Sequence, residues 1–221
     1  SRYSLIANWQ QENGSEFTKA NLFGYYYRLN LFSNFTYFLD DPVNGDQFEQ
    51  ADRRTGTAGE IKHQWSNQIS GKDVTTTVGA QVRNDSIPEV ALYHTKGKTR
   101  LSTTRDDDVT ETSGGLYAQS EIQWLEKFRT MVGVRGDLFY FDVSSSLPEN
   151  SGNDTDGIVS PKFGATFGPW SKTELYLNAG TGFYSNDARG TTITVDPSDP
   201  STAAPRVDPL VRSKGAEGGV R

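Results

Sequence analysis

The chain alternates between apolar and polar residues along most of its length, and the pattern is clearest over residues 116–141. Apolar residues recur there at alternate positions, namely Leu116, Ala118, Ile122, Trp124, Val132, Val134, Leu138 and Tyr140. The positions between them include Gln119, Glu121, Gln123, Arg135 and Asp137. A period of two is typical of a β-strand whose two faces meet different surroundings. The stretch therefore predicts a β-hairpin that turns at Glu126–Lys127, with one apolar and one polar face.

The same period predicts an all-β chain of about nine antiparallel strands. The expected strands cover residues 2–10, 17–39, 51–66, 74–84, both arms of the hairpin 116–141, 160–168, 173–185 and 210–221. Helical periodicity is hard to find between them. In water the apolar faces would need a second layer to cover them, and no helix or other class of strand is visible to supply it.

Short and long connections alternate along the chain. The expected short turns lie at residues 11–16, 67–73, 126–127 and 170–172, and the expected long polar loops at 40–50, 85–111, 146–159 and 186–209. In an up-and-down sheet this order places every long loop at one end. That arrangement is typical of a transmembrane β-barrel with short periplasmic turns and long extracellular loops.

The four tryptophans all lie beside the expected short turns, at Trp9, Trp65, Trp124 and Trp170. Three of them fall on the apolar face of their strand. Indole has an apolar body and a polar N–H, so it collects at the depth of the lipid headgroups. Chance placement, or a role as hydrophobic plugs at strand ends, is the alternative. These three share both the apolar face and the end of the sheet with the short turns, and this favours a girdle at the membrane interface.

The apolar face should then meet lipid, and the polar face should line a hydrated lumen. The residues expected to face this lumen include Arg28, Glu121, Arg135 and Asp137. Charges of both signs on neighbouring strands can form ladders across the sheet. Their expected role is structural, and ligand selectivity is expected in the long loops, which vary freely on a fixed scaffold.

Composition fits this picture. Apolar residues make up 34% of the chain and the mean hydropathy is −0.63, which is polar for a protein with a packed core. The net charge is −6 and no basic block is present, so the electrostatic signature of a nucleic-acid-binding protein is missing. The absence of cysteine excludes disulfides and thiolate metal sites.

Four stretches resemble the barrel of TonB-dependent outer-membrane receptors. The strongest are SPKFGATFGPWSKTELYLNAGTGFYSNDARG at 160–190 and PLVRSKGAEGGVR at 209–221, which carries a Lys-Gly-x-Glu-x-Gly pattern. EQADRRTGTAGEIKHQW at 49–65 and TSGGLYAQSEIQW at 112–124 look similar to other strands of the same barrels. The resemblance spans most of the chain and is strongest over residues 160–221.

The resemblance implies a barrel of about 22 strands with an N-terminal plug domain inside it. Such receptors bind a scarce nutrient, often a ferric siderophore or a vitamin, and import it with energy supplied through TonB. The implied partners are the plug, the remaining strands, TonB, lipid of the Gram-negative outer membrane and a small ligand. No catalysis and no cofactor are implied, and siderophore, cobalamin, saccharide and other metal chelates are all compatible ligands.

The chain departs from the family pattern in three respects. No plug sequence or TonB box is visible, the strands number about nine, and Arg221 stands where a complete barrel tends to end in an aromatic residue. An open sheet would leave two unpaired edges, which the bilayer core does not tolerate. Residues 1–221 are therefore expected to be one internal segment of a barrel domain, without the plug.

A search for catalytic motifs finds no nucleophile elbow, P-loop or GxGxxG pattern. The two histidines are not at metal-ligand spacing, and NDTDG at 153–157 lacks the glutamate of an EF-hand. The acidic run beside Arg105 has the alternative interpretation of a solvated loop tip. The candidate ligand-binding residues in the long loops are His94, Arg105, Asp106, Asp107, Asp108 and Arg189.

Two other functions remain open at this point. A small self-contained outer-membrane pore or adhesin shares the apolar-out pattern, and it predicts an even number of strands. A soluble β-sandwich or carbohydrate-binding module would use the abundant aromatic residues for stacking on sugars. The second alternative leaves the position of the tryptophans unexplained.

Overall fold

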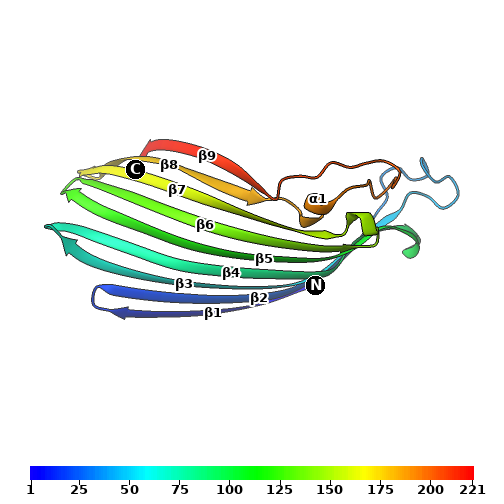
Figure 1. The fold of residues 1–221 in the computed structure, drawn as a ribbon, viewed down its shortest axis with the longest axis horizontal. Coiled ribbons are helices and arrows are strands. Elements are labelled where there is room, and N and C mark those ends of the chain that lie inside the picture. The colour runs from blue at the N-terminus through cyan, green and yellow to red at the C-terminus, as the bar shows by residue number, and fades with distance from the viewer.

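The computed structural model describes all 221 residues, and it contains a single nine-stranded antiparallel sheet in which each strand pairs with its sequence neighbours (Figure 1). The strands are β1 (Arg2–Asn13), β2 (Glu16–Ser33), β3 (Phe48–Ile69), β4 (Lys72–Lys96), β5 (Thr99–Leu125), β6 (Phe128–Ser145), β7 (Gly152–Trp170), β8 (Thr173–Ser185) and β9 (Leu210–Val220). The only helical segments are η1 (Pro148–Asn150) and α1 (Ala188–Thr192). The predicted all-β, up-and-down fold is confirmed. No helix is long and apolar enough to cross a membrane.

The four connections at one end of the sheet are short, as predicted, and each contains only two residues. They join β1 to β2, β3 to β4, β5 to β6 and β7 to β8. Three of these turns use left-handed backbone: Gly14 has φ 61°, Ser70 and Gly71 have φ 52° and 72°, and Ser171 has φ 59°. Positive φ at both central positions gives a turn whose twist matches that of the flanking strands.

The predicted loop over residues 85–111 is wrong. β4 continues to Lys96 and β5 begins at Thr99, so the segment is a long hairpin closed at Gly97 and Lys98, whose φ angles are 57° and 70°. The pairing shifts register between Ile87 and Val90 and at two further points toward the tip. Each shift interrupts the period of two, which explains why alternation along the sequence did not reveal these strands.

Two other boundaries differ from the prediction. The predicted loop 146–159 is largely strand, because β7 begins at Gly152. Conversely, the strand predicted to reach residue 39 ends at Ser33, and residues 34–47 form a loop. Within it the Asp46 carboxylate accepts hydrogen bonds from the backbone N–H groups of Leu39 and Asp41 at 2.8 and 2.7 Å. The segment 186–209 is a long connection, as expected.

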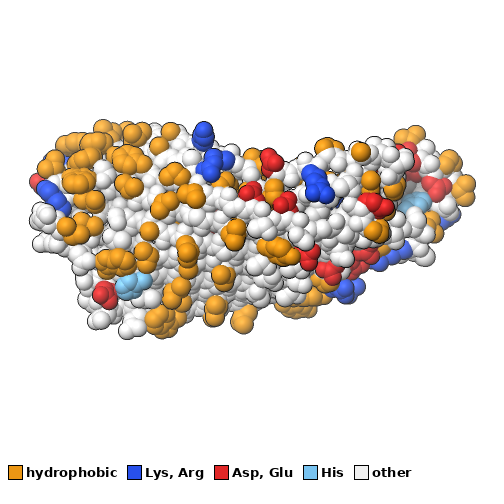
Figure 2. Space-filling model, viewed as in Figure 1, with side chains coloured by type: hydrophobic (Ala, Val, Ile, Leu, Met, Phe, Trp, Pro, Cys, Tyr) orange, Lys and Arg blue, Asp and Glu red, His pale blue; other side chains and the backbone are white.

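The two faces of the sheet differ in exposure. Leu116, Val132 and Leu138 on the apolar face are 70%, 55% and 59% exposed, whereas Asp137 on the polar face is 8% exposed. Side chains shield one another on the inner side of a curved sheet, so the polar face is the concave one. In the view of Figure 2, hydrophobic side chains cover the end with the short turns, and most charged side chains lie toward the other end.

All four tryptophans lie on the convex, apolar face near the short turns. Trp9 pairs with Ala20 and Trp65 with Thr76 in the outward-facing register. Trp170 joins this face because the pairing of β7 with β8 shifts between Phe167 and Trp170. Sequence parity alone had placed only three of the four there.

The main hydrophobic core lies on the concave face, at the end with the long connections. It consists of Ile87, Val109, Phe141, Val143 and Ala188. Ala188 belongs to α1, so residues 186–209 fold back over the ends of β5–β7 instead of projecting outward (Figure 1). This strap positions the candidate site.

Candidate functional site

Arginine and aspartate recur two residues apart on the concave face. The pairs are Asp52 with Arg54 on β3, Arg83 with Asp85 on β4, Arg105 with Asp107 on β5, and Arg135 with Asp137 on β6. A spacing of two puts both side chains on one face of a strand. Each guanidinium therefore contacts the carboxylate of its own strand, at 2.5 Å for Arg83 and 2.6 Å for Arg135.

A fifth pair begins the strap. Asp187 caps α1 by accepting a hydrogen bond from the backbone N–H of Arg189 at 3.0 Å. The Arg189 guanidinium also donates to both oxygens of Asp187, at 2.9 and 2.5 Å. Its Nη1 atom lies 3.9 Å from Asp107 on β5. Arg189 therefore joins the strap to the row of charge pairs on the strands.

The ionic state of this fifth pair follows from its contacts. Partial burial raises the pKa of Asp187, but the hydrogen bonds and positive charge of Arg189 outweigh burial and hold that pKa below its ordinary value. Hydrogen bonding to Asp187 raises the pKa of Arg189. Both groups are therefore charged at neutral pH.

We call the region around Arg54, Arg105, Asp107, Glu111 and Arg189 the vestibule. A cavity of about 240 Å³ is lined by Arg54, Glu111 and Arg189 among others. A second cavity, of about 500 Å³, lies beside Arg105 and Arg189. The Nη2 atom of Arg105 and the Oδ1 atom of Asp107 are buried and have no hydrogen-bond partner within the protein. Neither atom reaches the surface, and the guanidiniums that line the two cavities are those of Arg54, Arg105 and Arg189.

One buried amide fixes the strap over the vestibule. Asn150, in the connection between β6 and β7, is fully buried. Its Oδ1 atom accepts hydrogen bonds from the backbone N–H groups of Thr194 and Val195 at 2.8 and 2.9 Å, and its Nδ2 donates to the Val195 carbonyl at 3.0 Å. Thr192 Oγ1 donates to the Asn150 carbonyl at 2.8 Å. Two connections far apart in sequence are thereby held together.

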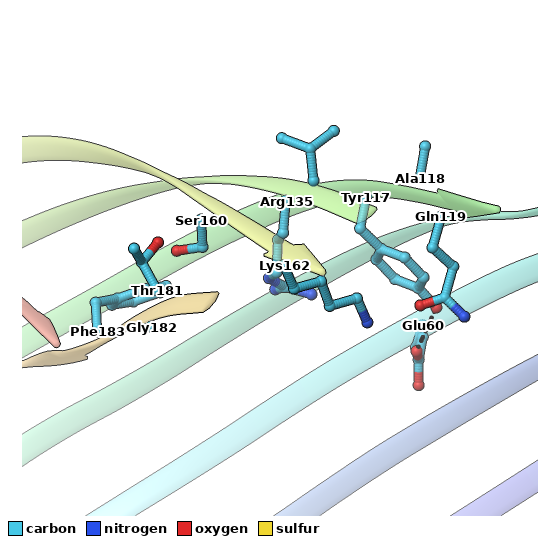
Figure 3. Close-up of a pocket in the computed structure, with 11 residues that line it drawn as sticks. Glu60, Tyr117, Ala118, Gln119, Arg135, Ser160, Lys162, Thr181, Gly182 and Phe183 are labelled. Atoms are coloured by element: carbon cyan, nitrogen blue, oxygen red, sulfur yellow. Dashed lines mark hydrogen bonds between the residues drawn. The ribbon is translucent and has the colours of Figure 1, made fainter. Parts of the chain in front are cut away.

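Below the vestibule the concave wall carries long polar side chains that lie flat. Figure 3 shows Tyr117 and Gln119 projecting from one face of β5, with Ala118 pointing the opposite way. Tyr117 donates to Glu60 Oε1 at 3.0 Å. A cavity of about 450 Å³ lies along this wall, and Lys162 lines it without forming an ion pair.

Glycines on neighbouring strands make room for these side chains. A Cβ atom at Gly79 would overlap the Tyr117 ring, and one at Gly115 would overlap the Arg135 guanidinium. A Cβ atom at Gly133 would lie 2.7 Å from Cε of Lys162. Glycine at these three positions therefore leaves room for a long side chain that crosses from the adjacent strand.

The structure brings together only part of the predicted ligand-binding set. Arg105, Asp107 and Arg189 meet in the vestibule. Asp106 and Asp108 alternate with Asp107 and lie on the other face of β5, where the Tyr93 hydroxyl donates to Asp106 at 2.8 Å. His94 contacts the Gly45 carbonyl at 2.6 Å instead of the cluster.

The predicted lumen-facing set also divides. By register, Glu121, Arg135 and Asp137 share the concave face. For Arg28 the prediction is wrong. Arg28 lies on the same face of β2 as Leu22, and the pairing of β2 with β3 makes this the apolar, convex face of the sheet. The apparent alternation near the end of β2 reverses there, with Leu29 and Leu31 on the concave face.

Sequence reasoning missed Arg54, Asp85 and Glu111, which line or adjoin the vestibule. The Arg–x–Asp and Asp–x–Arg spacing was the signal that could have found the first two. Glu111 has no such signal, because it approaches α1 only through the folding of the strap.

The whole chain, residues 1–221, matches the family model described as TonB dependent receptor-like, beta-barrel. It is similar to the ferric citrate transporter FecA in the unliganded form, with a TM-score of 0.68 and 12% identity over 82% of this chain and 27% of that one. For the copper transporter OprC the TM-score is 0.67, with 14% identity over 99% of this chain and 36% of OprC.

The ferric yersiniabactin uptake receptor FyuA from Yersinia pestis gives a TM-score of 0.62 and 15% identity, over 100% of this chain and 33% of FyuA. At these identities the likeness to solved structures shows the fold alone. The chain spans between 27% and 36% of the length of these three structures. No curated protein matches the sequence.

Proposed function

Because the chain belongs to the TonB-dependent receptor-like β-barrel family over residues 1–221, we propose that it forms part of the wall of a nutrient receptor in a Gram-negative outer membrane. The receptor binds a scarce nutrient at its extracellular mouth and imports it with energy supplied through TonB. The three similar structures are named as carriers of ferric citrate, copper and ferric yersiniabactin. Their names support a metal chelate as the class of ligand.

In this proposal the convex face meets lipid and the concave face encloses a plug domain. The tryptophans beside the short turns then mark the periplasmic interface, and the long connections are extracellular. Residues 1–221 are one segment of the barrel domain, and further strands complete the wall. The arginine–aspartate pairs within single strands suit a wall of this kind. Their charges are already neutralised, so a plug domain can slide past them.

The observation that carries the proposal is the vestibule. Arg105 and Asp107 keep one unpartnered donor and one unpartnered acceptor, and Arg189 lies beside them on a fixed strap. The guanidiniums of Arg54 and Arg189 line one cavity and those of Arg105 and Arg189 line the other, so a polar chelate that carries acceptor groups finds donors in both.

Uptake by the full-length receptor tests the proposal. Cells that depend on this receptor would be offered ⁵⁵Fe-labelled ferric citrate, a labelled ferric catecholate and labelled copper, with and without collapse of the proton gradient. We expect uptake of at least one probe, and its loss when the gradient is collapsed. Uptake of none of the probes would contradict the assignment to metal chelates, and gradient-independent uptake would indicate a passive pore.

The vestibule is tested in the same cells with Arg189→Gln and Arg105→Lys, which remove the planar guanidinium at each position. Each variant is expected to weaken binding of the imported probe about tenfold or more, the value of a charge-assisted hydrogen bond. The matched control is Lys172→Gln in the turn between β7 and β8, at the opposite end of the sheet. Equal affinities for all four proteins would place the ligand elsewhere.

A further inference from the structure

Two arginines lie directly opposite each other on the convex face. Arg28 of β2 pairs with Arg53 of β3, and both side chains are exposed. Like charges at directly opposed positions of a sheet destabilise each other. An external anion between the two guanidiniums would remove that repulsion. We call Arg28 and Arg53 the outer arginine pair.

This pair differs from the arginines of the concave face. Arg54, Arg83, Arg105 and Arg135 each contact a carboxylate on their own strand. Neither Arg28 nor Arg53 forms an ion pair, and neither side chain donates a hydrogen bond to a protein group. The outer arginine pair therefore lacks the carboxylate partner that each of these four arginines has.

The carboxylates nearest to the pair are already engaged. Glu49 accepts hydrogen bonds from Arg100 at 2.7 and 3.1 Å and from Asn30 at 2.6 Å. Glu89, the register partner of Arg53, is 3.4 Å from the same Arg100 guanidinium. Hydrogen bonding to Arg100 lowers the pKa of Glu49, and the charge of Arg28 also contributes to this lowering. The direct ion-pair partner of both Glu49 and Glu89, however, is Arg100.

The distance of the outer arginine pair from the short turns indicates its depth in a membrane. On the convex face of β2, the residues nearer the short turn are Leu22 and then Tyr26, which stacks on Tyr3 of β1 with ring centroids 6.4 Å apart. Tyrosine collects at membrane interfaces. Arg28 follows Tyr26, about twelve residues beyond the turn, and a spanning strand needs about 9–11. The guanidiniums thus lie at the depth of the outer headgroups.

We propose that Arg28 and Arg53 bind a phosphate group of a phosphorylated glycolipid in the outer leaflet. A guanidinium is a planar fork of donors that matches phosphate oxygens in a bidentate arrangement, and two such forks face one another here. The aromatic rings of Tyr3 and Tyr26 lie beside the upper acyl chains. The inference rests on the proposed outer-membrane location, and it is independent of the nutrient that the receptor carries.

The test uses the full-length receptor, purified and delipidated in a non-ionic detergent. The probe is lipid A carrying two phosphates, and dephosphorylated lipid A and inorganic phosphate are the comparison probes. We expect the phosphorylated lipid to bind and to raise the unfolding temperature, and the other two to give no shift at the same concentration. A site for small anions would respond to inorganic phosphate, and that result would overturn the proposal.

The variants are the double substitutions Arg28→Gln with Arg53→Gln, and Arg28→Lys with Arg53→Lys. The glutamine pair is expected to weaken lipid binding about tenfold or more, and the lysine pair to retain an intermediate affinity because it keeps the charge but loses the fork. The control is Arg206→Gln, an exposed arginine of the strap that has no ion pair. Wild-type lipid affinity in a folded glutamine pair would overturn the proposal. Lipid binding is measured without uptake, so failure of the transport proposal stays distinguishable.

Discussion

At the scale of single residues, the concave wall depends on which side chains are missing. Tyr117, Arg135 and Lys162 lie flat because glycines on the adjacent strands leave space for them. The lumen-side surface is therefore shaped by Gly79, Gly115 and Gly133 of the neighbouring strands as much as by the long side chains themselves. A glycine in a strand interior usually weakens it, so these positions point to a packing requirement.

Replacing Gly79 by valine is expected to destabilise the folded receptor by about 1–3 kcal/mol, the usual cost of overpacking. The new side chain would displace the Tyr117 ring and break its 3.0 Å hydrogen bond to Glu60. Unfolding of the purified full-length receptor by heat or denaturant measures the change. The control is Gly136→Val on β6, where no atom lies within 4 Å of the added Cβ. Equal destabilisation by both substitutions would show that the flat packing of Tyr117 is unimportant.

At the scale of elements, the strands that sequence reasoning found are those with an unbroken period of two. The turn at Glu126–Lys127 and the strand Thr173–Ser185 agree with the prediction to the residue. The outer half of β4 and β5 was missed because the bulges there displace every later side chain to the opposite face. The fold class was therefore predictable from local pattern, but the length of the hairpin formed by β4 and β5 was not.

The candidate site divides in the same way. Alternation separates Asp107 from Asp106 and Asp108, and the sequence alone could have shown that separation once the strand was recognised. The contact between Arg189 and β5 depends on a strap that returns over the sheet, and no local pattern encodes it. The strap is held there by the packing of Ala188 in the core with Phe141 and Val109 and by the hydrogen bonds of Asn150.

Removal of the Asn150 side-chain amide should loosen the strap, residues 186–209. In Asn150→Ala the backbone N–H groups of Thr194 and Val195 lose their acceptor, and each orphaned group costs about 1–3 kcal/mol. We expect faster hydrogen exchange and proteolysis within residues 186–209, with little change in the strands. The control is Asn153→Ala, an exposed position on β7. A strap that stays protected in Asn150→Ala would mean that Ala188 packing suffices to hold it.

At the scale of the whole molecule, the sheet has two free edges. β1 pairs only with β2 and β9 only with β8, so one side of each strand presents unpaired backbone groups. In hydrocarbon each unsatisfied group costs several kcal/mol, and only closed barrels avoid the cost. Under the proposed location in a membrane, the open edges therefore require further strands to complete the wall.

This argument predicts different behaviour for the isolated segment and the full-length receptor. Residues 1–221 alone, refolded in detergent, should give no compact monomer, and their open edges should drive association. The full-length receptor should run faster on a gel before boiling than after, because a closed barrel resists unfolding by detergent. Trypsin digestion before electrophoresis separates a folded wall from an aggregate. A protease-resistant, heat-modifiable monomer formed by residues 1–221 alone would mean that the nine strands close on themselves, and the receptor-wall proposal would then give way to a small pore.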